Sequence, residues 1–124
     1  MRTTPLAAAA LLLIVACTGP AGSTPSPSPA PPIAVELADF MITPEVIANS
    51  NPAVKIDVSS SGPTPHNLTI RDATGQRVAA SKDLRAGEAD TIEVTLQPGA
   101  YTMFCAFAGH ESLGMSGTLT INAP

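Results

Sequence analysis

The chain has 124 residues, which is enough for one small domain once any targeting segment is removed. Aromatic residues make up 3% of the sequence and tryptophan is absent, so the core must be aliphatic, and 13 prolines with nine glycines disfavour long helices. The formal net charge is −4 and the six Lys and Arg residues form no cluster, which excludes a nucleic-acid partner because phosphate binding needs grouped basic side chains.

The first sixteen residues have the pattern of an export signal. Arg2 supplies a positive start, and residues 6–16 form an apolar run that is too short to span a bilayer comfortably. The run ends at Ile14-Val15-Ala16-Cys17, which resembles the lipobox of bacterial lipoproteins, where the cysteine is lipidated and becomes the mature N-terminus. We therefore predict a signal peptide at 1–16, lipidation at Cys17 and an extracytoplasmic protein anchored to the cell membrane. A plain cleaved signal peptide with an incidental cysteine is the alternative.

Residues 17–32 are predicted to form a tether. This segment is rich in proline and serine and has no apolar periodicity, so it favours an extended polyproline II conformation. At about 3.1 Å per residue it could hold a domain up to roughly 45 Å from a membrane.

Residues 33–124 are predicted to be a single all-β domain. Apolar and polar residues alternate with a period of two in residues 33–37, 54–58, 91–96 and 118–121, and more weakly in 66–71 and 77–81. Turn signals separate these runs, and no convincing helix is present. Seven or eight short strands in a domain of this size indicate a two-sheet β-sandwich.

Cys105 is a lone thiol if Cys17 carries the lipid, because the chain has only two cysteines. A free thiol outside the cytoplasm is open to oxidation unless it is buried or bound. Cys105 should end a strand that begins after the Pro98-Gly99 turn, and His110 and Met115 follow it at equal spacing. A loop of this length can gather all three side chains around one point.

These three side chains suit copper. Thiolate, imidazole and thioether are soft or borderline donors, and blue copper sites combine two His and one Cys with a long axial Met. The only other histidine in the chain is His66, so the expected ligands are His66, Cys105, His110 and Met115. Taken singly, each residue also has an ordinary interpretation as a surface or core residue. We expect Met103 and Met41 to be core.

At this point the sequence resembles the cupredoxins, the blue copper family that includes plastocyanin, azurin and auracyanin. The resemblance covers about residues 33–123 and rests on Pro65-His66-Asn67, on residues 99–105 and on the Cys105, His110 and Met115 spacing. It implies a Greek-key β-sandwich with copper at one end and Met115 as the axial ligand. It also implies that Asn67 joins the two ligand segments around the cysteine. The alternative for Asn67-Leu68-Thr69 is a glycosylation sequon.

The predicted function is the transfer of single electrons between redox proteins at the membrane by a monomeric, tethered Cu(II)/Cu(I) carrier. All four coordination positions come from the chain, and no nucleophile–base set is recognisable, so we expect no enzyme activity. A copper delivery or storage protein for an extracytoplasmic oxidase is the alternative.

We expect electrons to pass through His110 at the domain surface, inside an apolar docking patch. Redox partners meet over small, weak interfaces, which such a patch would suit. Inward packing of Phe107 and Leu113 over the core is the alternative. The predicted members are Pro63, Pro65, Phe107, Ala108, Leu113 and Gly114.

Overall fold

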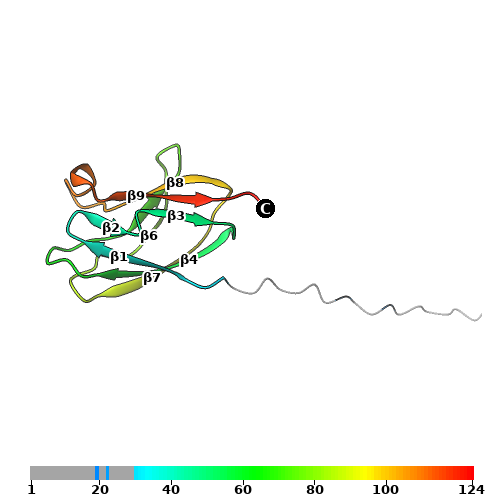
Figure 1. Cartoon of the computed structure of the whole chain (residues 1–124), viewed down its shortest axis with the longest axis horizontal. Helices are drawn as coiled ribbons and strands as arrows, with labels where there is room; N and C mark the ends of the chain where they lie inside the picture. Colours follow the sequence, from blue (N-terminus) through cyan, green and yellow to red (C-terminus); the bar gives the residue numbers. More distant parts are fainter. Residues whose placement is uncertain (1–18, 20–21, 23–29) are drawn as a thin grey trace, which may run out of the picture.

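The computed structural model of the chain describes residues 19, 22 and 30–124 (Figure 1). The predicted signal peptide, Cys17 and most of the predicted tether lie outside the described residues. Within the described part, no helix is both long and apolar enough to cross a membrane.

The described residues form nine β-strands and one short 3-10 helix. In chain order these are β1 (Ile33–Ala38), β2 (Met41–Thr43), β3 (Val46–Asn49), β4 (Ala53–Ser60), β5 (Thr69–Arg71), β6 (Arg77–Ala80), β7 (Ala89–Thr95), β8 (Gly99–Phe104), η1 (Glu111–Leu113) and β9 (Ser116–Ile121).

The strands make two sheets, and the chain passes back and forth between them. One sheet has the order β2-β1-β4-β7 and the other has the order β3-β9-β8-β5-β6. The pairs β1–β4 and β3–β9 are parallel, whereas the other pairs are antiparallel. Because sequence neighbours such as β3 and β4 lie in different sheets, the result is a β-sandwich, and the predicted fold class is confirmed.

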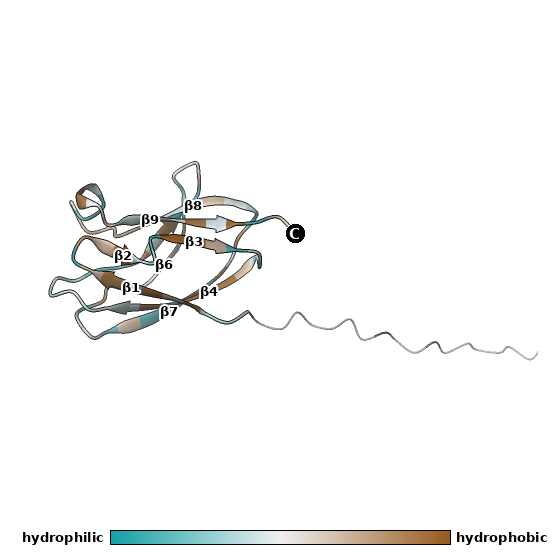
Figure 2. Ribbon diagram, in the orientation of Figure 1, coloured by the Kyte–Doolittle hydropathy of each residue, from teal (hydrophilic) through white to brown (hydrophobic). Residues whose placement is uncertain are grey.

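Period-two alternation places the core between the sheets. In β4 every second residue is buried, beginning with Val54 and ending with Ser60. Side chains on successive strand residues point to opposite faces, so this register turns one face of β4 inward along its whole length. Hydrophobic residues concentrate on strands such as β1 and β3 (Figure 2). Leu37, Ile56 and Leu119 are fully buried in the aliphatic core.

The expected strand count of seven or eight was too low. The sequence prediction missed β2 and β3, which have three and four residues. Pro44 and Glu45 separate them, so neither is long enough to establish a recognisable alternation. Tertiary pairing with β1 and β9 holds them extended.

Of the two methionines expected in the core, Met103 is fully buried, but Met41 is 55% exposed. The expectation for Met41 was therefore wrong. Met41 lies on β2, an edge strand, and its register with Ala38 sends its side chain away from the sheet interface that buries Ile42.

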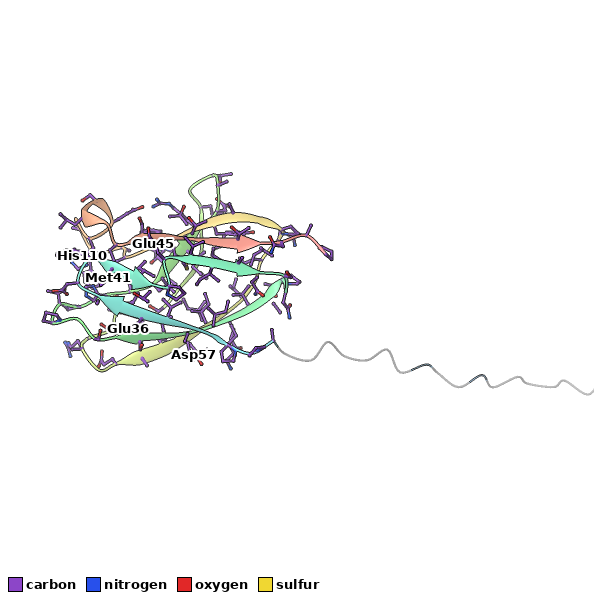
Figure 3. All side chains as sticks on the ribbon, viewed as in Figure 1. Glu36, Met41, Glu45, Asp57 and His110 are labelled. Atoms are coloured by element: carbon purple, nitrogen blue, oxygen red, sulfur yellow. The ribbon has the colours of Figure 1, made fainter. Side chains whose placement is uncertain are left out.

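The C-terminus and the η1 turn lie at opposite ends of the sandwich (Figure 1). Strand β1 starts at the end where the C-terminus lies and runs toward the opposite end, where the η1 turn is found (Figure 1). His110 and Met41 lie at this second end, and Asp57 lies nearer the first (Figure 3).

Candidate metal centre

Three of the four predicted ligands meet at one point. The donor atoms of His66, Cys105 and His110 all lie within 4.8 Å of one another. The Nδ1 atoms of the two histidines are 3.3 Å apart, and the Cys105 Sγ is 3.5 Å from the Nδ1 of His110. Both imidazoles therefore face the same point with Nδ1, and their Nε2 atoms are not needed as ligands.

Backbone hydrogen bonds fix the position of His66. It precedes β5 and forms an isolated bridge with Leu84: the His66 N–H donates to the Leu84 carbonyl at 2.9 Å, and the His66 carbonyl accepts from the Leu84 N–H at 2.7 Å. The His66 side chain is fully buried. This histidine is thus fixed on the inner side of the site.

Cys105 and Met115 are brought together by the β8–β9 ladder. The ladder ends with Phe104 opposite Ser116, and one residue further the Cys105 N–H donates to the Met115 carbonyl at 3.2 Å. Both side chains are buried, with 1% and 0% exposure. Cys105 and Met115, ten residues apart in the sequence, therefore lie side by side just beyond the end of this ladder.

His110 occupies the loop between them. Its N–H donates to the Phe107 carbonyl at 3.1 Å, and its carbonyl accepts from the Met115 N–H at 3.0 Å, so the loop is closed on both sides. After η1 the chain reverses at Gly114, whose φ of 108° lies in the left-handed region that favours glycine. The His110 side chain stays partly exposed, unlike that of His66.

Asn67 connects the two ligand segments. Its side-chain oxygen accepts a 2.8 Å hydrogen bond from the N–H of Ala106, the residue after Cys105. Its side-chain nitrogen donates to Asp83 at 2.9 Å. The bond to Ala106 has the geometry that the family resemblance implied for this residue, and it restrains Cys105 relative to His66.

Arg71 makes a second connection between residues adjacent to ligands. Its guanidinium forms a two-pronged pair with Glu111, including one 3.0 Å hydrogen bond to Oε2. The guanidinium carbon also lies 4.3 Å from the centroid of the Phe104 ring. Glu111 follows His110, and Phe104 precedes Cys105. Arg71 thus ties the His110 loop to the end of β8 by a geometry that only arginine provides.

Sequence reasoning missed Asp39, which contacts the ligand His66. The Oδ1 atom of Asp39 lies 3.0 Å from the His66 Nε2 and accepts a 2.7 Å hydrogen bond from the Thr64 hydroxyl. The bond from Thr64 lowers the pKa of Asp39 below its ordinary value, and the contact with His66 acts in the same direction. An acidic residue after a strand is ordinary in sequence, so no local signal could have identified it.

Most of the six residues predicted to form an apolar docking patch are exposed. Pro63, Pro65, Ala108, Leu113 and Gly114 are exposed, and Phe107 is partly buried. Leu113 is 63% exposed, which contradicts inward packing of that side chain. Met41, which was not predicted as a member, is 55% exposed and lies near His110 in Figure 3. Phe40, also not predicted, is 42% exposed. The Phe40 ring packs edge-on against His110 at 5.5 Å.

The chemistry of the donor set fits copper. One thiol, two imidazoles and a thioether are soft or borderline donors, and the combination of two His and one Cys with Met is the set of blue copper sites. Cys105 and Met115 are buried, and the two Nδ1 atoms converge with the Cys105 sulfur. His66, Cys105, His110 and Met115 are therefore arranged as a type 1 copper site on a β-sandwich.

The sequence model described as a cupredoxin-like domain matches residues 6–121, so the chain belongs to the cupredoxin-like family. That span includes part of the predicted signal peptide and the predicted tether. No curated protein matches the chain.

Solved structures agree on the fold. The chain is similar to dithionite-reduced auracyanin from the photosynthetic bacterium Roseiflexus castenholzii, with 18% identity, a TM-score of 0.66 and coverage of 76% of this chain and 98% of that one. It is similar to auracyanin B, with 21% identity, a TM-score of 0.67 and coverage of 78% and 92%. It also resembles an azurin from the obligate methylotroph Methylomonas sp. strain J, with 20% identity, a TM-score of 0.62 and coverage of 72% and 95%.

Replacing Met115 with glutamine should keep copper in the site but lower its reduction potential. The axial ligand tunes the potential of such sites, and an amide oxygen is a harder donor that favours Cu(II) over Cu(I). Protein voltammetry measures the shift. The matched control is Met103→Leu, which changes an equally buried methionine and should leave the potential in place. A potential that is unchanged or raised in Met115→Gln would exclude Met115 as the axial ligand.

Proposed function

We propose that this protein carries single electrons between redox partners. The observation that supports this most directly is the contrast between the ligands: Cys105, His66 and Met115 are buried, and His110 alone reaches the surface, within an apolar patch. Four protein donors leave no evident position for a substrate, whereas a catalytic metal keeps one open.

The chain's own residues supply rigidity and shielding. Copper bound there would supply one-electron chemistry by changing between Cu(II) and Cu(I), which prefer different geometries. The hydrogen bond from Ala106 to Asn67 and the pairing of Arg71 with Glu111 hold the ligand segments in one arrangement. Buried ligands exclude water from the site. A donor set that does not rearrange keeps the cost of each oxidation-state change low.

We also propose that the apolar patch is the surface on which partners dock. The apolar patch consists of the six predicted residues together with Phe40 and Met41. Two of its members contact the partly exposed His110, whose ring centroid lies 5.5 Å from that of Phe40 and 5.7 Å from that of Phe107. A partner on this patch would approach a ligand ring directly. Weak, brief contacts between redox proteins suit a small apolar surface.

Membrane attachment through Cys17 remains part of the proposal. Support comes from where the domain begins: β1 starts at the end of the sandwich away from η1 (Figure 1). A tether joined there would leave the apolar patch turned away from the attachment point. It would also raise the effective concentration of the carrier near membrane-bound donors and acceptors.

The proposal is tested by adding Cu(II) to the mature chain and following its visible spectrum and voltammetry. An electron carrier should become intensely coloured through thiolate-to-copper charge transfer and should give a reversible one-electron wave. A colourless protein that binds Cu(I) tightly and forms no stable Cu(II) state would instead support copper delivery.

Leu113→Asp should slow electron exchange with the physiological partner by about tenfold or more without altering the visible spectrum. A charge placed in an apolar contact loses its water without gaining a partner. Stopped-flow kinetics measures the rate. Ala53→Asp is the control, because Ala53 is exposed at the start of β4, which runs parallel to β1 and so begins at the far end of the sandwich. Equal rates in both variants would rule out the patch as the docking surface.

Cys17→Ala should release the protein from the membrane while leaving its copper spectrum normal. Each buried CH2 of an acyl chain contributes about 0.8 kcal/mol to membrane binding, and stable anchoring needs two membrane-binding signals. Membrane fractionation and intact-mass measurement check the result. A wild-type protein found in the soluble fraction, with no added mass at Cys17, would refute lipidation and leave the copper site unaffected.

A further inference from the structure

The buried ligand His66 has a charged neighbour on the side that faces away from the other ligands. Its Nδ1 lies 3.3 Å from the Nδ1 of His110, whereas its Nε2 lies 3.0 Å from the Oδ1 of Asp39. The imidazole is fully buried, and the Asp39 side chain is 34% exposed. The Asp39 carboxylate therefore extends from the surface to the buried Nε2 of His66.

Two further residues hold this contact in place. The Thr64 hydroxyl donates to the same Oδ1 atom at 2.7 Å. Gly62 packs directly over the pair: a Cβ at this position would lie 2.6 Å from the His66 Nε2 and 2.7 Å from the Asp39 Oδ1. Only glycine leaves room for the carboxylate and the imidazole to meet, so the contact depends on two separate segments of the chain, the turn at Asp39 and residues 62–66.

The turn that carries Asp39 touches both histidine ligands. Asp39 bonds to His66, and the next residue, Phe40, packs its ring against His110. Phe40 has a φ of 58°, in the left-handed region that non-glycine residues rarely occupy. This backbone conformation turns consecutive side chains toward the two ligands.

We propose that Asp39 is a positioning residue of the copper site and that its negative charge lowers the reduction potential. A carboxylate that accepts the Nε2–H fixes the tautomer of His66, so that the Nδ1 lone pair faces Cys105 and His110. The same hydrogen bond makes the imidazole a stronger donor. A more basic ligand and a nearby negative charge both stabilise Cu(II) more than Cu(I).

This inference rests on the copper site, and it adds to the proposed function a residue that sets the driving force for electron transfer. A plain structural role is the competing explanation, since Asp39 could merely close the turn after β1. Glu36 can distinguish the two roles, because it lies on β1 three residues before Asp39, has the same charge and also accepts a hydrogen bond, from the Ser61 hydroxyl. This hydrogen bond joins Glu36 to Ser61, which is not a predicted copper ligand.

The experiment compares Asp39→Asn with Glu36→Gln in the copper-loaded mature chain, by protein voltammetry at one pH. Substitutions of residues that orient metal ligands change metal affinity by about 10- to 100-fold. If Asp39→Asn weakens Cu(II) binding tenfold relative to Cu(I), the potential rises by about 59 mV for one electron. Glu36→Gln should move the potential much less. Equal shifts, or no shift in Asp39→Asn, would overturn the proposal.

Thr64 provides an independent test that leaves the carboxylate in place. Thr64→Val removes the hydroxyl that holds Asp39, so the potential should rise in the same direction but by a smaller amount. Thr64→Ser keeps the hydroxyl and should restore the wild-type value. If Val and Ser give the same potential, the hydroxyl does not act through Asp39 and the proposal fails.

A measurement without copper addresses the tautomer. In the metal-free wild type, ¹⁵N–¹H correlation spectra of the imidazoles should show the proton of His66 on Nε2. In Asp39→Ala it should be distributed over both nitrogens. Nε2 protonation that persists in Asp39→Ala would contradict the positioning role. A wild-type chain that fails to bind copper would refute the proposed function instead, and this result cannot be confused with an unchanged potential in a coloured Asp39→Asn protein.

Discussion

Replacing Cys105 with serine should abolish the intense visible band of the copper-loaded protein. The band arises from charge transfer between a thiolate and Cu(II), and Cys105 is the only cysteine among the described residues. Serine is a poor ligand for this ion because its hydroxyl stays protonated at neutral pH, so copper affinity should fall as well. The measurement is the absorption spectrum after addition of one equivalent of Cu(II).

The Cys105→Ser domain should still fold without copper. The Cys105 side chain is 1% exposed, and its sulfur lies 3.5 Å from the His110 Nδ1, which offers a partner to the serine hydroxyl. Without a partner, burial of the hydroxyl would cost about 1–3 kcal/mol. Circular dichroism of the metal-free protein checks the fold, and Ala106→Ser is the coloured control at the adjacent exposed position. A blue Cys105→Ser protein would show that the thiolate is not the ligand.

Gly117→Ala should destabilise the domain and disturb the predicted copper site, because the ligand Met115 lies two residues before Gly117. A Cβ at Gly117 would lie 2.4 Å from the backbone oxygen of Glu45 and 3.2 Å from the Cε of Met103. The first contact is with backbone that accepts a 2.8 Å hydrogen bond from Thr118, so it cannot move without cost. Overpacking of this kind costs roughly 1–3 kcal/mol.

Chemical denaturation of the metal-free protein measures this loss of unfolding free energy. Thr118→Ala is the control, because the next side chain is exposed and its removal should change stability by about 0.5 kcal/mol or less. The copper band of Gly117→Ala should also shift or broaden, since Met115 immediately precedes β9, the strand that carries Gly117. A Gly117→Ala protein as stable as the control would contradict this prediction and show that the Glu45 backbone moves aside easily.

Much of the site was predictable because copper chemistry needs scarce residues. The chain has two histidines, and one cysteine remains once Cys17 is set aside, so the ligand set had few alternatives. Strand β4 was predictable for a different reason: its residues 54–58 alternate strictly between apolar and polar, and its buried and exposed residues alternate in the same way. The short strands β2 and β3 were not, because three or four residues carry too little periodicity.

The sequence by itself determined the family, the fold class and the residue types that suit copper, because these depend on local alternation and on donor chemistry. Only the tertiary structure decided what surrounds the ligands. Asp39 lies 27 residues from His66, and Arg71 lies 40 residues from Glu111. Phe40 likewise packs against His110. Such contacts join turns and strand ends from different parts of the chain, and their distances depend on how the two sheets pack. No short-range pattern encodes that packing, so the control of the copper site by its neighbours could be seen only in the fold.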